Sequence, residues 1–398
     1  MSLFSAVELA PRDPILGLNE QFAADTHPNK VNLGVGVYFD ENGKLPLLAC
    51  VQAAEKTLMA TPKARGYLPI DGIAAYDSGV KNLVFGADSE PVQSGRVATV
   101  QALGGTGALK IGADFLKHLN PNAKVLISDP SWENHRALFT QAGFAVSTYR
   151  YYDATTRQLN FEGMLADLQA AAAGTIVVLH ACCHNPTGYD LTPAQWDQVI
   201  AAVQARGLTA FLDMAYQGFA NGIAEDGAVI SKFAAAGLSF FVSTSFSKSF
   251  SLYGERVGGL SVLCASKEEA ARVLSQLKIM IRTNYSNPPT HGGAVVATVL
   301  NDPALRAQWD QELAGMRTRI KAMRQALVDG LKAAGVQRNM DFITTQVGMF
   351  SYSGLSKEQM VRLRSEFGVY GTDTGRMCVA ALNTHNLPHV CKSIAAVL

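Results

Sequence analysis

Residues 238–259 read LSFFVSTSFSKSFSLYGERVGG, an apolar run that breaks into alternating hydroxyl and aromatic residues around Lys248. A lysine that is partly removed from water and lies near another cation has a lowered pKa. Its neutral amine can then attack a carbonyl group. Ser245, Ser247 and Arg256 supply hydrogen-bond donors that suit a phosphate. A nucleophilic lysine beside a phosphate site indicates a Schiff base with pyridoxal phosphate.

Two other interpretations fit the same stretch. A lysine at the end of a strand is commonly a solvated surface charge. Ser245 and Lys248 also match the Ser-x-x-Lys signature of serine acylases, but the companion motifs Ser-Asp-Asn and Lys-Thr-Gly are absent from the sequence. The rest of the chain has to decide between a cofactor lysine and a surface lysine.

The composition is that of a large globular protein. The 398 residues are enough for two domains, and 48% hydrophobic with 17% charged residues supply an ordinary core. A net charge of +1 without blocks of like charge gives no reason to expect nucleic acid or an anionic membrane as partner. No apolar run reaches the length of a membrane span.

The cysteines and the first residues predict a cytoplasmic protein. A chain of this size needs no disulfides, and no Cys-x-x-Cys pair occurs among Cys50, Cys182, Cys183, Cys264, Cys378 and Cys391. Residues 1–13 lack the basic region and apolar core of a secretory signal. His180, Cys182, Cys183 and His184 look like metal ligands. However, adjacent strand residues point to opposite faces and no second ligand pair follows, so no metal is predicted.

From about residue 96, apolar runs alternate with helical patterns. The expected strands are 97–102, 124–128, 145–150, 175–180, 208–212, 239–244 and 259–264, and expected helices include 108–119, 160–172 and 194–205. This alternation predicts an α/β fold with a mostly parallel, seven-stranded sheet between helices. A three-to-four-residue spacing of apolar residues predicts one long helix over about 303–333, followed by a small α+β part.

The N-terminal region predicts two short elements. A helix can start near Asp13, with Pro14 in its first turn. Residues 31–38 form a strand-like run that Gly34 and Gly36 interrupt, and such glycines permit a bulge or a close approach of the backbone to another group.

Residues with chemical potential follow five of the expected strands. In parallel sheets ligands bind beyond the carboxyl ends of the strands, where these residues would meet. They lie in the segments Gly104–Gly107, Asp129–His135, Cys182–Gly188, Asp213–Phe219 and at Lys248. The sequence therefore predicts one crevice that all five segments line.

The residue types in that crevice suit a pyridine cofactor. The helix start at Gly105 and Thr106 offers donors to an anion. The Asp213 carboxylate can pair with a protonated ring nitrogen, and Tyr216 can donate to a ring oxygen. Asn185 can serve the same oxygen, and Trp132 offers a face for stacking. Two arginines, Arg282 and Arg376, have the planar fork that binds carboxylates.

A dinucleotide site is the strongest rival interpretation. Gly105, Thr106 and Gly107, with Asp129 at the end of the next strand, imitate the fingerprint of an NAD-binding oxidoreductase. The third glycine position is occupied by Lys110, which weakens the match. A Walker loop is excluded because no Gly-Lys-Ser/Thr follows.

Several motifs together resemble the aspartate and aromatic-amino-acid aminotransferase family. They are CCHNPTG (182–188), DMAYQGF (213–219), SFSK (245–248), LYGERVG (252–258) and NYSNPP (284–289), and the similarity runs from Asp13 to the C-terminus. The resemblance implies a fold-type I pyridoxal phosphate enzyme that works as a homodimer with shared active sites. It divides the chain into an arm with part of the small domain (1–47), a large cofactor-binding domain (48–310) and a small C-terminal domain (311–398).

The resemblance also implies a role for each site residue. Lys248 would form the Schiff base and move the proton of a ping-pong transamination. The phosphate would be held by Gly105, Thr106, Ser245, Arg256 and Tyr67 of the partner subunit. The ring would be held by Trp132, Asp213, Asn185 and Tyr216, with His135 supporting Asp213. Substrates would be bound by Arg376 at the α-carboxylate, by Arg282 of the partner subunit at a distal carboxylate, and by Gly36, Trp132 and Asn185 along the pocket.

The substrate preference follows from smaller differences. The aspartate branch commonly has Leu-Tyr-Asn-Glu-Arg where residues 252–256 read LYGER, and this segment together with SWENH (131–135) is closer to the bacterial aromatic branch. We therefore predict transamination of aromatic amino acids and aspartate with 2-oxoglutarate. A specific aspartate aminotransferase is the alternative. A non-catalytic relative would have no need of Lys248, Asp213 and Arg376 together. The sequence leaves open whether the bonds preceding Pro130 and Pro186 are cis.

Overall fold

A seven-stranded sheet forms the centre of the larger part of the computed structural model, which describes residues 2–13 and 15–398. The strand order is β2-β10-β9-β8-β7-β3-β4, with β10 antiparallel to both neighbours and the other pairs parallel. The strands are β2 (Val97–Leu103), β3 (Lys124–Asp129), β4 (Ala145–Arg150), β7 (Ile176–His180), β8 (Thr209–Met214), β9 (Phe240–Ser245) and β10 (Val257–Leu263). The predicted mostly parallel sheet is confirmed, and each expected strand is found within two residues of its predicted bounds.

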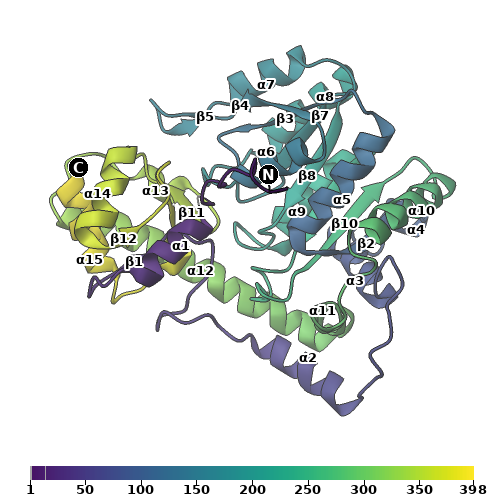
Figure 1. Ribbon diagram of the computed structural model, residues 1–398, viewed down its shortest axis with the longest axis horizontal. Helices are drawn as coiled ribbons and strands as arrows, with labels where there is room; N and C mark the ends of the chain where they lie inside the picture. The colour runs from purple at the N-terminus through teal and green to yellow at the C-terminus, as the bar shows by residue number, and fades with distance from the viewer. Residues whose placement is uncertain (1, 14) are drawn as a thin grey trace.

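Helices cover both faces of this sheet (Figure 1). One face packs against α5 (Gly104–Leu119), α6 (Glu133–Gln141) and α10 (Lys267–Asn284). The other packs against α3 (Ala74–Phe85), α7 (Phe161–Ala170), α8 (Pro193–Arg206) and α9 (Ile223–Ala235). Because alternate strand residues face these two layers, β7, β9 and β10 are buried along their whole lengths.

The long helix α12 (Pro303–Ala333) leads from the sheet to the smaller part of the molecule (Figure 1). It begins at a cap in which the Asp302 carboxylate accepts from the backbone N–H groups of Ala304 and Leu305, with Pro303 at the first helical position. Its buried face includes Trp309, Leu313 and Ile320, whose spacing had predicted the helix.

The smaller part joins the two ends of the chain. The N-terminal α1 (Leu16–Ala24) lies beside the C-terminal elements in Figure 1, and β1 (Val31–Asn32) pairs in parallel with β12 (Val369–Tyr370). An antiparallel pair unites β11 (Phe350–Tyr352) and β13 (Arg376–Cys378). The remaining elements here are α13 (Phe342–Thr345), α14 (Lys357–Phe367), a 3₁₀ turn (Val379–Ala381) and α15 (Leu387–Val397).

The predicted strand over 31–38 is wrong beyond Asn32. The chain after β1 is irregular, since Gly34 and Gly36 interrupt the run and the backbone turns along a pocket instead. The helix expected near Asp13 begins at Leu16, and Pro14 lies outside the described residues.

The other elements are α2 (Ala49–Ala60), α4 (Glu90–Gln93), α11 (His291–Asn301) and the hairpin of β5 (Tyr152–Asp153) and β6 (Gln158–Leu159). All six cysteines are buried free thiols. No helix in the described ranges combines the length and the apolar character needed to cross a membrane.

Candidate active site

A cavity of about 170 Å³ opens at the carboxyl ends of the parallel strands. Segments that are far apart in the sequence line it: Ile15, Gly36, Gly105, Thr106, Leu109, Trp132, His180, Asn185, Asp213, Ala215, Tyr216, Ser245, Ser247, Lys248, Arg256, Phe350 and Arg376. Eleven of the fourteen site residues expected from the sequence are in this set. His135 lies directly behind the cavity wall, whereas Tyr67 and Arg282 do not contribute to the cavity of their own chain.

The amine of Lys248 is in a setting that favours its neutral form. Burial lowers the pKa of Lys248 to about 8, and the positive charges of Arg256 and Arg376 act in the same direction against the attraction of Asp213. Its Nζ atom lies 4.9 Å from the centre of the Tyr216 ring. A lysine of this kind is a competent nucleophile and base close to neutral pH.

One end of the cavity is an anion site. The N-terminus of α5 begins there at Gly104, and the Arg256 guanidinium donates to Ser247 Oγ at 3.3 Å and to the Tyr253 carbonyl at 3.2 Å. A Cβ atom at Gly104, whose φ is +68°, would lie 2.4 Å from Arg256 Nη2. Glycine is therefore required for the guanidinium to lie against the helix start, where N–H groups and helix dipole favour a phosphate.

The Asp213 carboxylate is held in its charged form. Burial alone would raise its pKa, but the hydrogen bond and charge of His135, together with His180 and Ser243, lower it below the usual value. His135 Nε2 lies 2.8 Å from Asp213 Oδ2, and Ser131 Oγ lies 2.9 Å from the other ring nitrogen of His135. Ser243 donates to Asp213 Oδ1 at 3.2 Å. An anion fixed in this way can keep a nearby pyridine nitrogen protonated.

Arg376 is a buried charge that lacks a counterion. Its side chain donates to Asn185 Oδ1 at 3.0 Å and to the Gly34 carbonyl at 2.7 Å, while its buried Nε has no partner. Within the described part of the chain no carboxylate pairs with it, although Arg376 is only 2% exposed. The guanidinium lies over Phe350, 4.3 Å from the ring centre. Because a buried charge without a partner is unfavourable, this site is suited to an incoming carboxylate.

Two peptide bonds that precede proline lie in segments that line the cavity. The peptide bonds Asp129–Pro130 and Asn185–Pro186 are both cis. They lie in the segments that carry Trp132 and Asn185 to the cavity.

The donor set fits pyridoxal phosphate. An anion site, a partly neutral lysine amine and a charged carboxylate line one cavity, with the indole of Trp132 and the phenol of Tyr216 on its walls. These are the functions that a phosphate, an aldehyde, a pyridine nitrogen, a ring face and a phenolic oxygen each require.

Tyr67 and Arg282 are at the surface. Tyr67 is 95% exposed, and Arg282 projects from α10, where it donates to Ser286 Oγ. A single chain therefore leaves both of these residues available to another molecule.

Phe350 and His180 are among the pocket residues that the sequence did not identify as site residues. Phe350 sits in a short strand without any chemical motif, so no local signal distinguishes it from a core residue. His180 was considered only as a metal ligand, yet it pairs in register with Asp213 across β7 and β8. Both ring nitrogens of His180 are buried without a partner, and burial lowers its pKa well below the usual value.

The chain belongs to the aminotransferase class I and II family, whose model matches residues 28–394. It is therefore a pyridoxal-phosphate-dependent transaminase of fold-type I. This assignment confirms the family that the motifs resembled and removes the dinucleotide interpretation.

Known relatives carry two names. The chain is 63% identical over 398 residues to an aspartate aminotransferase of Pseudomonas aeruginosa and 54% identical over 397 residues to the aromatic-amino-acid aminotransferase of Escherichia coli, with 100% of each chain covered in both cases. Among solved structures, it is similar to the aromatic-amino-acid aminotransferase of Burkholderia pseudomallei covalently bound to pyridoxal phosphate. The TM-score is 0.97, with 68% identity and 100% of both chains covered.

Proposed function

We propose that this transaminase accepts aromatic amino acids and aspartate, with 2-oxoglutarate as the second substrate. The observation that carries the proposal is the unpaired Arg376 beside Lys248, because it offers a carboxylate site next to a reactive amine. The apolar side chains of Ile15, Leu109 and Phe350 in the same cavity favour an aromatic substrate. Relatives named for both substrate classes, at 63% and 54% identity, support the dual preference.

In this proposal the cofactor is held at its two ends. Gly105, Thr106, Ser245 and Arg256 bind its phosphate, together with Tyr67 of the partner subunit. Trp132 stacks on the ring, Asp213 with His135 behind it binds the ring nitrogen, and Asn185 and Tyr216 bind the ring oxygen. When bound, pyridoxal phosphate supplies an aldehyde that joins to amines and a pyridinium ring that accepts the electron pair left at the α-carbon.

The protein side chains then divide the work. Arg376 and the Gly36 backbone orient the substrate by its α-carboxylate. Asp213 keeps the ring nitrogen protonated throughout both half-reactions. Lys248 Nζ, with its pKa lowered to about 8, would take the proton from the α-carbon as a base and would then donate it as an acid. A keto acid leaves, and 2-oxoglutarate is converted by the reverse sequence.

We further propose a homodimer with composite sites. The surface positions of Tyr67 and Arg282 support a role in the pocket of the other subunit. We also propose that residues 1–47 and 311–398 form a small domain beside a large domain of residues 48–310. The six unpaired cysteines support a reducing compartment, for which we propose the cytoplasm.

A specific aspartate aminotransferase is the second candidate. The 63% identity to the Pseudomonas aeruginosa enzyme of that name favours it. The two candidates differ in turnover of tyrosine, which only the dual enzyme converts at a rate comparable with aspartate.

Arg282→Leu provides the test. If Arg282 of the partner subunit binds the distal carboxylate, the variant should lose about 100-fold or more in kcat/KM for aspartate, since it removes a charge-assisted bidentate pair. Its kcat/KM for tyrosine should be retained. Arg272→Leu, another arginine of α10, is the matched control. Equal losses for both substrates would contradict the role of Arg282, and an enzyme that never converts tyrosine would favour the second candidate.

A further inference from the structure

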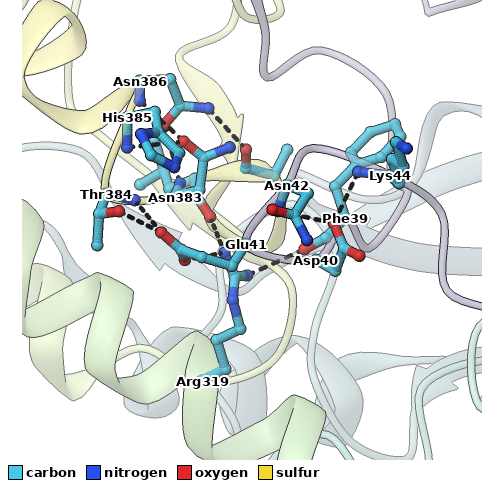
Figure 2. Close-up of polar contacts among 12 residues, drawn as sticks. Phe39, Asp40, Glu41, Asn42, Lys44, Arg319, Asn383, Thr384, His385 and Asn386 are labelled. Carbon is cyan, nitrogen blue, oxygen red and sulfur yellow. Dashed lines mark hydrogen bonds and ion pairs between the residues drawn. The ribbon is translucent and has the colours of Figure 1, made fainter.

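Arg319 of α12 connects its own helix to residues 39–41 and to the chain that follows β13 (Figure 2). One guanidinium nitrogen donates to the Phe39 carbonyl at 3.0 Å. The other donates to the Leu382 carbonyl at 2.7 Å and to Glu41 Oε2 at 3.1 Å. A single side chain thus ties the irregular segment after β1 to the long helix and to the chain that follows β13.

Glu41 provides the second half of this connection (Figure 2). Its other oxygen accepts from the backbone N–H of Thr384 at 2.9 Å and from the Thr384 hydroxyl. These bonds, followed by the one from Arg319, lower the pKa of Glu41 to about 2. The carboxylate therefore remains charged at any pH at which the enzyme works. We call Arg319, Glu41 and Thr384 the latch.

The chain before Glu41, residues 34–39, leads back to the active-site cavity. Phe39 donates its N–H to the Ala380 carbonyl at 3.1 Å, and Tyr38 donates its N–H to Tyr253 Oη at 2.9 Å, three residues before Arg256. Two residues before Tyr38, Gly36 forms part of the pocket wall, and a Cβ atom added to it would lie only 2.7 Å from Phe350 Cζ.

The same segment supplies a partner of Arg376. The Gly34 carbonyl accepts from its guanidinium at 2.7 Å, and Phe350, which touches Gly36, lies under that guanidinium. Residues 33–38 have no strand partner of their own, and two of them are glycines. Backbone bonds of Leu33 to Tyr370 and Cys378 anchor the start of this segment. The N–H bonds of Tyr38 and Phe39, together with the latch, anchor its end.

We propose that Arg319 is a positioning residue for carboxylate recognition, acting through residues 34–41 on Arg376. This inference rests on the proposed role of Arg376 in binding the substrate carboxylate. Removing the Arg319 guanidinium frees the Phe39 and Leu382 carbonyls and leaves Glu41 held only by Thr384. The Gly34 carbonyl then no longer holds Arg376 in one orientation, whereas the Phe350 ring stays in place through the β11–β13 pair. None of the Arg319 bonds involves Arg256, so the anion site keeps the bonds of Arg256 to Ser247 and Tyr253.

The test is the affinity of the holoenzyme for 3-phenylpropanoate. This aromatic compound has one carboxylate and no amine, so it reports on Arg376 without turnover. In titration calorimetry, Arg319→Met should raise its Kd about tenfold. Arg319→Lys, which keeps the charge but loses the fork, should give a smaller increase. Arg317→Met is the matched control, because Arg317 lies on the same helix but donates to the Gly218 carbonyl of the larger part. Its Kd should remain within about twofold of the original value.

Affinity for pyridoxal phosphate separates positioning from general disruption. We expect Arg319→Met to keep the cofactor affinity of the original protein, whereas a variant that had lost its fold would lose both affinities. The proposal would be overturned if Arg319→Met lost affinity for both ligands. It would also be overturned if Arg319→Met kept the original Kd for 3-phenylpropanoate while Arg376→Lys raised it. An unchanged Kd in Arg376→Lys itself would overturn the proposed function, and this inference with it. If Arg319→Met does not fold, Arg319→Lys and Glu41→Gln make the same comparison.

Discussion

Single residues in this pocket owe their chemistry to what surrounds them. Lys248 and Arg376 are both basic side chains of one cavity, but burial lowers the pKa of the Lys248 amine to about 8, whereas guanidinium groups stay protonated in proteins. Asp213 lines the same cavity, but its two carboxylate oxygens accept hydrogen bonds from His135 and Ser243. The result is a nucleophile, an anion and an unpaired cation at separate positions, which a transaminase needs.

A substitution at Gly36 tests whether the Phe350 ring must lie directly beneath the Arg376 guanidinium. In Gly36→Ala the new Cβ atom would lie 2.7 Å from Phe350 Cζ and 3.3 Å from Cε1, so the ring must move from beneath the guanidinium. We expect kcat/KM to fall roughly tenfold for tyrosine and aspartate alike, mainly through a higher KM.

Gly315→Ala is the matched control for that change. An added Cβ atom there meets nothing within 4 Å, and the position is in the middle of α12. It should leave kinetics unchanged and stabilise the protein by about 0.5–1 kcal/mol. If Gly36→Ala behaves like this control, the wall does not position Arg376.

The sequence predicted the site residues that belong to recognisable motifs. It did not predict the residues whose roles depend only on tertiary contacts. Lys248, Asp213 and Asn185 follow strands, so the sheet pattern was enough to bring them together. Phe350 contacts Arg376 through a ring face, and Arg319 contacts the carbonyl of Phe39, 280 positions away in the sequence. No local sequence pattern marks either contact. Cis bonds before Pro130 and Pro186 were equally beyond the sequence pattern.

At the scale of elements, the alternation of strands and helices predicted the sheet because both faces of each strand are buried by helices. The segment after β1 was predicted less well. Its apolar residues suggested a strand over 31–38, but only Val31 and Asn32 pair, and side-chain anchors rather than a ladder hold the remainder. The periodicity of apolar residues carries no information about such long-range side-chain hydrogen bonds.

Helix α3 carries a half-buried carboxylate, that of Asp77, whose effect on stability depends on pH. Burial, and next the nearby Asp71, raise the pKa of Asp77 to about 8, against the attraction of Lys81 and Lys278, and its Oδ1 has no partner. The folded protein then binds a proton that the unfolded chain has already lost. Stability should therefore decrease as the pH rises from about 4 to about 8.

Asp77→Asn should remove this part of the pH dependence. The variant should gain in unfolding temperature relative to the original protein as the pH rises, with the largest gain at about pH 9, measured on the same buffer series. Asp88→Asn, at an exposed position after the same helix, serves as control. A difference between Asp77→Asn and the original protein that stays constant with pH would contradict the half-buried, protonated carboxylate.

At the scale of the whole molecule, most of the expected site residues line one cavity, but two of them lie elsewhere on the surface. The cavity collects its residues from both parts of the chain, while Tyr67 and Arg282 remain at the surface. The sequence pattern alone could not reveal this division, because residues 62–68 and the end of α10 carry no sign of where they act. The family resemblance supplied that expectation.

Mixing two inactive variants tests the composite site. Lys248→Ala and Arg282→Leu should each be inactive with aspartate as homodimers. After subunit exchange, each mixed dimer would hold one pocket with Lys248 and an intact Arg282 of the partner subunit. About one quarter of the original activity should return. If no activity returns after exchange has been verified, each subunit uses its own Arg282 and the shared site is wrong.

The most direct test of the central claim is the absorbance spectrum of the holoenzyme. Tyrosine and aspartate are added separately, without any keto acid, and the visible band of pyridoxal phosphate bound at Lys248 is followed. A dual transaminase predicts that each amino acid bleaches the band and releases its keto acid in an amount equal to the pockets present, and that Lys248→Ala shows no such band. A band that aspartate alone bleaches would contradict the aromatic preference, and the absence of any band after reconstitution would contradict the role of Lys248.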